Sequence, residues 1–163
     1  EAGGVALDLR DANSVEAAAQ KILDNAKAYK ADARIDGVEV HEMVSGGVEA
    51  IVGARDDALY GPMLLVGSGG VLVELLEDVS LGMLPLSEAQ IAERISHLKL
   101  AKLLAGYRGR KEADAQALAK AAEGLGRFFL DHREKIADIE INPLVAREAG
   151  KGVVALDIRV IWR

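Results

Sequence analysis

Three oxygen-bearing side chains near the end of the chain have the types and spacing for metal and phosphate chemistry. Glu140 and Asn142 lie in the apolar run 136–145, and Asp157 lies in a second run, 153–161. If both runs are paired strands, all three side chains reach one place. Magnesium prefers hard oxygen ligands of this kind. An acid inside an apolar strand costs stability without a partner, and a cation that bridges to phosphate is such a partner.

A purely structural role explains the same residues. Alternation at period two puts Asp138, Glu140 and Asn142 on one face of the first run. Asn142 and Asp157 can then pair with the backbone, or with Arg159, near a sheet edge. Spacing alone favours this structural role, because edge strands that contain an acid are common.

Other motifs carry weaker signals. The glycine-rich segment 67–70 matches neither the Rossmann fingerprint nor the Walker pattern, and strand-like runs on both sides predict a hairpin turn there. His41, His97 and His132 are scattered and define no catalytic triad. The stretch 106–110 carries two arginines that can grip an anion, although a basic helix terminus explains them equally well.

The run 38–44 alternates at period two and predicts a half-buried strand, which ends at Val44. Glu42 at the end of this strand can accept hydrogen bonds from a ribose, and the neighbouring backbone can pair with an adenine edge. Ser45 and Glu49 follow closely. Taken alone, a solvated strand face explains these residues just as well.

Composition excludes several classes of protein. With 163 residues, half of them hydrophobic, the chain can bury the core of one domain. A net charge of -6 argues against binding to nucleic acid, and the apolar runs are too short to cross a membrane. The absence of cysteine agrees with a cytoplasmic setting. Because the chain opens on Glu1 rather than Met, we expect it to be a piece of a longer polypeptide.

The remaining patterns predict an α+β fold, with a mainly antiparallel sheet packed against helices. Helices are expected over 13–29 with Asn13 as N-cap, over 88–97 with Ser87 as N-cap, over 98–104 and over 112–132. Strands are expected over 4–9, 38–44, 48–54, 63–66, 71–76, 79–84, 136–145 and 153–161. The run 38–44 is expected to form a hairpin with 48–54.

Taken in order, motifs along nearly the whole chain resemble the ATP-grasp portion of the ADP-forming acyl-CoA synthetases, which are related to the succinyl-CoA synthetase β subunit. An ordered series of matches is more specific than any single motif. The matching segments are 37–44, 49–53, 60–62, 67–71, 103–109 and 140–144.

The resemblance implies a role for each candidate residue and favours the magnesium role over the structural one. Asn142 and Asp157 would hold magnesium on the nucleotide phosphates, and Glu140 would meet a phosphohistidine loop from a CoA-binding portion. The implied nucleotide contacts are Glu42, Val44 and Ser45 in the adenine–ribose hinge, and Glu49 toward the ribose or phosphates.

The family's reaction joins an acid to CoA at the expense of ATP, through an acyl-phosphate and a phosphohistidine. A complete ATP-grasp module also has an upstream lobe with a phosphate-contacting lysine, so residues 1–163 would be one partial ATP-grasp domain. The CoA-binding and ligase-like domains are implied partners. We therefore expect the isolated chain to be inactive and to bind nucleotide weakly.

Two other hypotheses remain open at this point. ATP-grasp-like regions also occur in multidomain protein acetyltransferases, where they serve regulation or assembly. An α+β scaffold that binds only a partner chain is the third hypothesis.

Overall fold

The computed structural model describes residues 2–70 and 77–163 of the chain. These residues belong to two compact units, Glu1–Ser45 and Gly46–Arg163. The assignment of residues 1–163 to one partial ATP-grasp domain stays a prediction.

The first unit holds one helix, α1 (Ala12–Tyr29), between two extended segments. The helix begins one residue earlier than predicted, and Asp11 rather than Asn13 is its N-cap. Asp11 Oδ1 accepts the Ser14 N–H at 2.8 Å, and Ser14 Oγ accepts the Asp11 N–H at 3.3 Å. This reciprocal pair satisfies two backbone donors that would otherwise be free at the helix start.

Both strands predicted for this unit are wrong. Segments 4–9 and 38–44 belong to no strand, and Val5 and Val40 are more than 70% exposed (79% and 72%). A period-two pattern forms a strand only where a neighbouring strand pairs with it. Within the described residues, the hairpin partner expected for 38–44 pairs with other strands instead.

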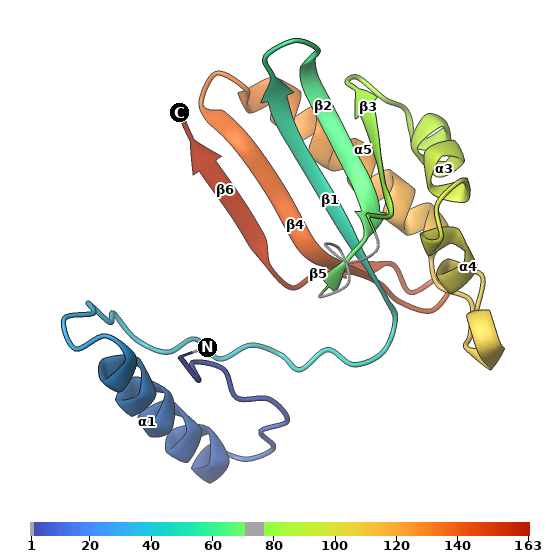
Figure 1. Ribbon diagram of the computed structural model, residues 1–163. Coiled ribbons are helices and arrows are strands. Elements are labelled where there is room, and N and C mark those ends of the chain that lie inside the picture. The colour runs from blue at the N-terminus through green and yellow to red at the C-terminus, as the bar shows by residue number, and fades with distance from the viewer. Residues whose placement is uncertain (1, 71–76) are drawn as a thin grey trace. The chain divides into compact units, whose positions relative to one another are not determined.

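The second unit is built on a six-stranded antiparallel sheet, whose order is β3-β2-β1-β4-β5, with β6 also paired to β4 (Figure 1). The predicted strand 71–76 lies outside the described residues. The strands are β1 (Val48–Asp57), β2 (Gly61–Ser68), β3 (Val79–Met83), β4 (Ile136–Ala146), β5 (Val153–Ala155) and β6 (Ile158–Trp162).

Helices cover one face of this sheet (Figure 1). They are α3 (Glu88–Ser96), α4 (Leu100–Leu104) and α5 (Ala115–His132), with a short 3-10 turn, Tyr107–Gly109, after α4. Alternate residues of β1, such as Val52, enter the core with Leu118 and Phe129 of α5. The other residues of β1, including Glu49 and Gly53, therefore lie on the opposite face, which we call the open face. The α+β prediction is confirmed.

Side-chain caps begin the two longer helices of this unit. Ser87 caps α3 as predicted, in a reciprocal pair with Gln90. Asp114 caps α5 by accepting the Ala117 N–H at 3.0 Å, which starts that helix later than predicted. His97 and His132 lie at helix C-termini, where Nδ1 of each ring contacts the carbonyl oxygen of the residue four positions earlier.

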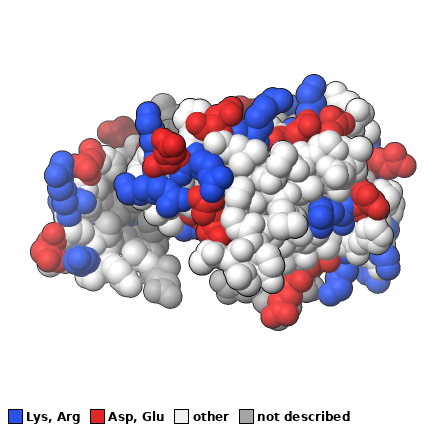
Figure 2. All heavy atoms as spheres, turned by 90° about the horizontal axis from the view of Figure 1, so that it is seen from above, with Lys and Arg blue, Asp and Glu red and all other residues white. Residues whose placement is uncertain are grey.

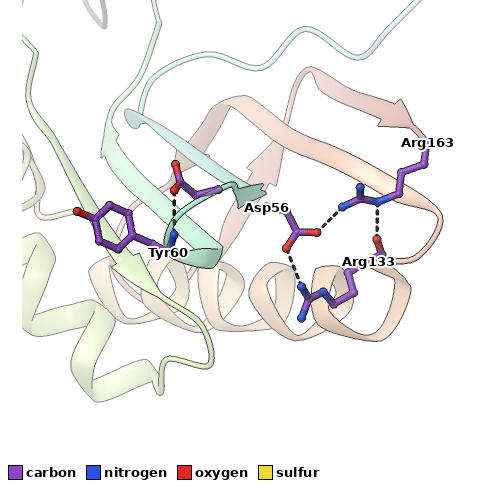
Figure 3. Close-up of polar contacts among 5 residues, drawn as sticks. Asp56, Tyr60, Arg133 and Arg163 are labelled. Carbon is purple, nitrogen blue, oxygen red and sulfur yellow. Dashed lines mark hydrogen bonds and ion pairs between the residues drawn. The ribbon is translucent and has the colours of Figure 1, made fainter.

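An ionic cluster at the end of β1 joins three parts of the second unit. The Asp56 carboxylate contacts Arg133, after α5, at 3.0 Å and also contacts Arg163, after β6 (Figure 3). Arg163 Nε in turn donates to the Arg133 carbonyl at 2.8 Å. We call these three residues the Asp56 clamp.

Acidic and basic side chains are interspersed on the face drawn in Figure 2. This mixture agrees with the modest net charge of -6. Among the described residues, no helix is both long and apolar enough to cross a membrane.

Candidate functional site

An irregularity in β4 lies at the centre of the predicted site. Ala50 of β1 pairs with Leu144, but Val52 pairs with Ile141, so Asn142 and Pro143 together lie opposite one residue of β1. Such a β-bulge interrupts the ladder and redirects side chains, and bulges are frequent beside active sites. The bulge therefore gives Asn142 an environment different from that of a regular strand position.

The strand on the other side of β4 is interrupted at the same level. The predicted single strand 153–161 is wrong, because β5 ends at Ala155 and β6 begins at Ile158. In the break, the Asn142 N–H donates to the Asp157 carbonyl at 3.1 Å, and the Leu156 N–H donates to the Pro143 carbonyl at 3.0 Å. The bulge and the break thus set Asn142 and Asp157 side by side.

The break also changes the environment of Asp157. Asp157 is exposed, whereas the sequence pattern indicated that it lies within an apolar strand. Within residues 2–70 and 77–163, its carboxylate makes no hydrogen bond or ion pair. The Asp157 carboxylate is therefore available to a ligand.

The glycine-rich segment at the end of β2 reaches the same place. The Gly70 N–H donates to Asn142 Oδ1 at 3.1 Å, and the Gly69 N–H donates to the Glu49 carbonyl at 2.9 Å. The Glu49 carboxylate also lies against the position that a side chain on Gly70 would occupy. These contacts bring Glu49 and Asn142 together, although 93 positions of sequence separate them (142 minus 49).

The hairpin turn predicted for 67–70 is wrong. Residues 67 and 68 belong to β2, and β2 already pairs with β1 along one edge and with β3 along the other, so no hairpin partner can follow directly. A Cβ on Gly69 would lie 2.5 Å from the Ala50 carbonyl oxygen and 2.8 Å from its Cα. Gly70 has a φ of +70°, in the left-handed region that favours glycine. The two glycines are thus required by close packing and by backbone conformation.

Glu140 lies on the open face of β4, opposite Gly53 of β1. A Cβ on Gly53 would be 3.7 Å from the Glu140 Cβ and Cγ, so the acid lies over the glycine. Arg159 of β6 is the residue paired with Glu140 of β4. Its guanidinium lies 3.5 Å from the Glu140 carboxylate and 3.1 Å from the Asp138 carboxylate. The structural alternative in which Asn142 or Asp157 pairs with Arg159 is therefore wrong.

These residues fit a magnesium ion that is shared with a bound phosphate. The Asn142 amide oxygen has two lone pairs, of which the Gly70 N–H takes one. Within the described ranges, no group of three or more His, Cys, Asp and Glu residues could hold a metal alone. Magnesium usually takes one or two protein oxygens together with phosphates and water. Asn142 and Asp157 form such a pair.

Three predicted nucleotide contacts lie in the other unit. Glu42 and Ser45 are exposed and Val44 is half-buried, all in the extended segment after α1. Their roles stay predictions.

Asp78 is buried beside this site but was not among the residues predicted from the sequence. Burial raises the pKa of the Asp78 carboxyl, but hydrogen bonds from Ser68, Lys99 and Leu100 outweigh burial and hold the pKa below its usual value. The sequence does not single it out, because Asp78 is one of three acids in the stretch 71–79, with Glu74 and Glu77.

Comparison with known proteins identifies the family of this chain. A model of the ATP-grasp domain matches residues 1–161. The chain is 37% identical over 160 residues to 4-hydroxybutyrate–CoA ligase [ADP-forming] of Nitrosopumilus maritimus, and this match covers 98% of the chain and 23% of that protein. It is also 37% identical over 161 residues to the acetate–CoA ligase [ADP-forming] I subunit beta of Pyrococcus furiosus, and this match covers 99% of the chain and 68% of that subunit.

A solved structure is similar over the same length. It is the dinucleotide-forming acetyl-coenzyme A synthetase 1 of Ca. Korarchaeum cryptofilum with coenzyme A and Mg-AMPPCP, whose phosphohistidine segment points towards the nucleotide binding site. The TM-score is 0.85 at 35% identity, covering 99% of this chain and 69% of that one. The chain spans about a quarter of the length of the longer relatives and about two thirds of the β subunit. It belongs to the ATP-grasp family, in the branch found in the ADP-forming acyl-CoA synthetases.

Proposed function

We propose that this chain is the nucleotide- and magnesium-binding portion of an ADP-forming acyl-CoA synthetase. The observation that carries the proposal is the β4 bulge opposite the break between β5 and β6. It sets Asn142 beside Asp157, with Glu140 two positions earlier on the same strand. The names of the relatives support this class of reaction.

Asn142 and Asp157 hold the magnesium ion that accompanies the nucleotide. A bound magnesium ion neutralises charge on the phosphates during phosphoryl transfer. The Gly70 N–H fixes the Asn142 amide oxygen, and the exposed Asp157 carboxylate adds a negative oxygen ligand beside it.

Glu140 receives the phosphohistidine segment of a partner domain. Its carboxylate can accept a hydrogen bond from an imidazole N–H and so orient the ring during transfer. Arg159, 3.5 Å away, restricts the Glu140 carboxylate to the open face, where an incoming segment can reach it.

Four further residues bind the nucleotide itself. Glu42 accepts hydrogen bonds from the ribose, and the backbone near Val44 pairs with the adenine edge, with Ser45 adjacent. Glu49 contacts the ribose or the phosphates, and its position beside Gly70 supports this role.

The whole reaction is acid plus CoA plus ATP to acyl-CoA plus ADP plus phosphate. The γ-phosphoryl group of ATP passes through a phosphohistidine to the acid, and CoA then displaces phosphate from the acyl-phosphate. The CoA-binding and ligase-like domains or subunit of the same enzyme are the proposed partners.

The test uses the full-length protein that carries this chain, with two matched substitutions. Glu140→Gln removes the charge proposed to meet the phosphohistidine. Asp138→Asn removes a charge from the same strand that also pairs with Arg159. We expect Glu140→Gln to abolish phosphoenzyme formation from labelled ATP while the calorimetric affinity for Mg·ATP stays within about twofold.

The control defines the outcome that contradicts the proposal. Asp138→Asn should keep phosphoenzyme formation close to the wild-type rate. Equal rates in Glu140→Gln and the wild type would remove Glu140 from the transfer. Absence of Mg·ATP binding in the wild-type full-length protein would reject the proposed function.

A further inference from the structure

A buried carboxylate lies behind the glycine-rich segment. Asp78 is 7% exposed, and three donors converge on it. The Ser68 hydroxyl and the Leu100 N–H both donate to Oδ2, at 2.7 and 2.8 Å, and the Lys99 N–H donates to Oδ1 at 2.8 Å. A buried charge with this many partners fixes its neighbours firmly.

These contacts fix the point at which the chain leaves β2. Besides its hydroxyl, Ser68 gives its N–H to the Asp78 carbonyl at 2.9 Å, so backbone and side chain are both held. The next two N–H groups, those of Gly69 and Gly70, go to the Glu49 carbonyl and to Asn142 Oδ1. Three successive residues therefore connect Asp78 to a proposed magnesium ligand.

We propose that Asp78 is a positioning residue of the nucleotide and magnesium site, which acts by fixing residues 68–70 so that the Gly70 N–H orients the Asn142 amide oxygen. This inference rests on the proposed function and deepens it. Groups that hydrogen-bond metal ligands fix the orientation of those ligands, and their loss typically weakens metal binding about 10- to 100-fold.

Asparagine is the informative substitution at position 78. It is nearly isosteric with aspartate, but one acceptor oxygen becomes an NH₂ group that faces donors. At least one of the Ser68, Lys99 and Leu100 contacts must then be lost.

Asp114 offers a matched control elsewhere in the same unit. It caps α5 by accepting the Ala117 N–H and also accepts the Gly152 N–H at 2.9 Å. Like that of Asp78, its pKa is lowered, in this case by hydrogen bonds from Ala117 and Gly152. Asp114→Asn therefore reports the cost of losing a capping carboxylate without disturbing residues 68–70.

The experiment compares Asp78→Asn and Asp114→Asn in the full-length protein by two measurements. The first is amide hydrogen exchange at Gly69 and Gly70 without ligand, which should accelerate at least tenfold in Asp78→Asn only. The second is calorimetric ATP affinity with and without magnesium. Asp78→Asn should weaken Mg·ATP binding at least tenfold and change metal-free ATP binding by less than threefold.

Ser68→Ala is the variant for the case in which Asp78→Asn does not fold. It removes one of the three donors, and we expect the same two changes at smaller amplitude. Wild-type exchange at Gly69 and Gly70 in either variant, or equal losses of Mg·ATP affinity in Asp78→Asn and Asp114→Asn, would overturn the inference.

The ligand-free measurement separates this inference from the proposed function. If the wild type fails to bind Mg·ATP, the proposed function fails and Asp78 has no such site to position. Accelerated exchange would then report only a structural contact. If the wild type binds and exchange at Gly69 and Gly70 stays unchanged in Asp78→Asn, the inference alone fails.

Discussion

Gly69→Ala tests whether the glycine segment is packed as tightly as the structure indicates. The added Cβ would lie 2.5 Å from the Ala50 carbonyl oxygen and 2.8 Å from its Cα. Carbon atoms do not approach backbone atoms this closely, and Ala50 lies in a central strand that cannot easily move. Overpacking typically costs 1–3 kcal/mol, and backbone contacts put this site near the upper end, at about 2–3 kcal/mol.

Gly124→Ala makes the same chemical change where space is available. Gly124 lies inside α5, and a Cβ there would meet no atom within 4 Å. Alanine in a helix interior is more stable than glycine by roughly 0.5–1 kcal/mol. The two substitutions should therefore shift stability in opposite directions.

Urea unfolding followed by circular dichroism measures both shifts. With a slope of about 2 kcal/mol per molar urea, the Gly69→Ala midpoint should fall by about 1–1.5 M and the Gly124→Ala midpoint should rise by about 0.3–0.5 M. The reasoning is refuted if Gly69→Ala unfolds at or above the wild-type midpoint, because Gly69 could not then be in contact with the Ala50 backbone.

Two further predictions concern ion pairs. Asp56→Asn breaks the partly exposed Asp56 clamp, so we expect the free energy of unfolding to fall by about 1 kcal/mol, and by less in 1 M salt. Asp36→Asn, in a more exposed pair with Arg34, should lower it by less than about 0.5 kcal/mol. Equal losses in urea unfolding would contradict this. Hydrogen bonds from Lys151 and Lys111 lower the pKa of Glu148 from 4.5 to about 2. A lowered folded pKa stabilises the protein above pH 4.5 and ceases to do so as the pH falls toward 2. The urea midpoint of the wild type should therefore exceed that of Glu148→Gln at pH 6 by more than at pH 3, and a constant difference would reject this assignment.

Sequence patterns predicted the elements whose signals are local. Ser87 with Gln90, and the apolar stripe of α5, are contained within a few turns of helix, so α3 and α5 were found with errors only at their ends. The same logic located α1 but predicted Asn13 as its N-cap, whereas the N-cap is Asp11. Both can cap a helix, and the choice depends on which side chain meets its partner, here Ser14.

Features that depend on partners distant in sequence were missed. Segment 38–44 has the alternation of a strand but no paired neighbour among the described residues, whereas β1 has one on each side. The register of the β4 bulge depends on β1, although Pro143 was its local signal, because proline inside a central strand is confined to bulges. The break at Asp157 follows from that bulge, because a straight strand could not pair with both halves of β4.

The candidate site residues were chosen for a different reason. Asn142 and Asp157 were selected by resemblance, since spacing alone favoured a structural role. The structural role and the proposed metal role are compatible at Asn142. Its side chain does pair with the backbone, through the Gly70 N–H, and this contact leaves a lone pair of the amide oxygen for a metal.

Charge explains why the proposed site needs a cation at all. Glu49, Glu140 and Asp157 are carboxylates, and the chain carries a net charge of -6, so a bare nucleotide triphosphate would meet repulsion. Arg159 is already engaged by Asp138 and Glu140. A magnesium ion at the proposed ligands Asn142 and Asp157 would offset this repulsion, so we expect the site to bind Mg·ATP more tightly than metal-free ATP.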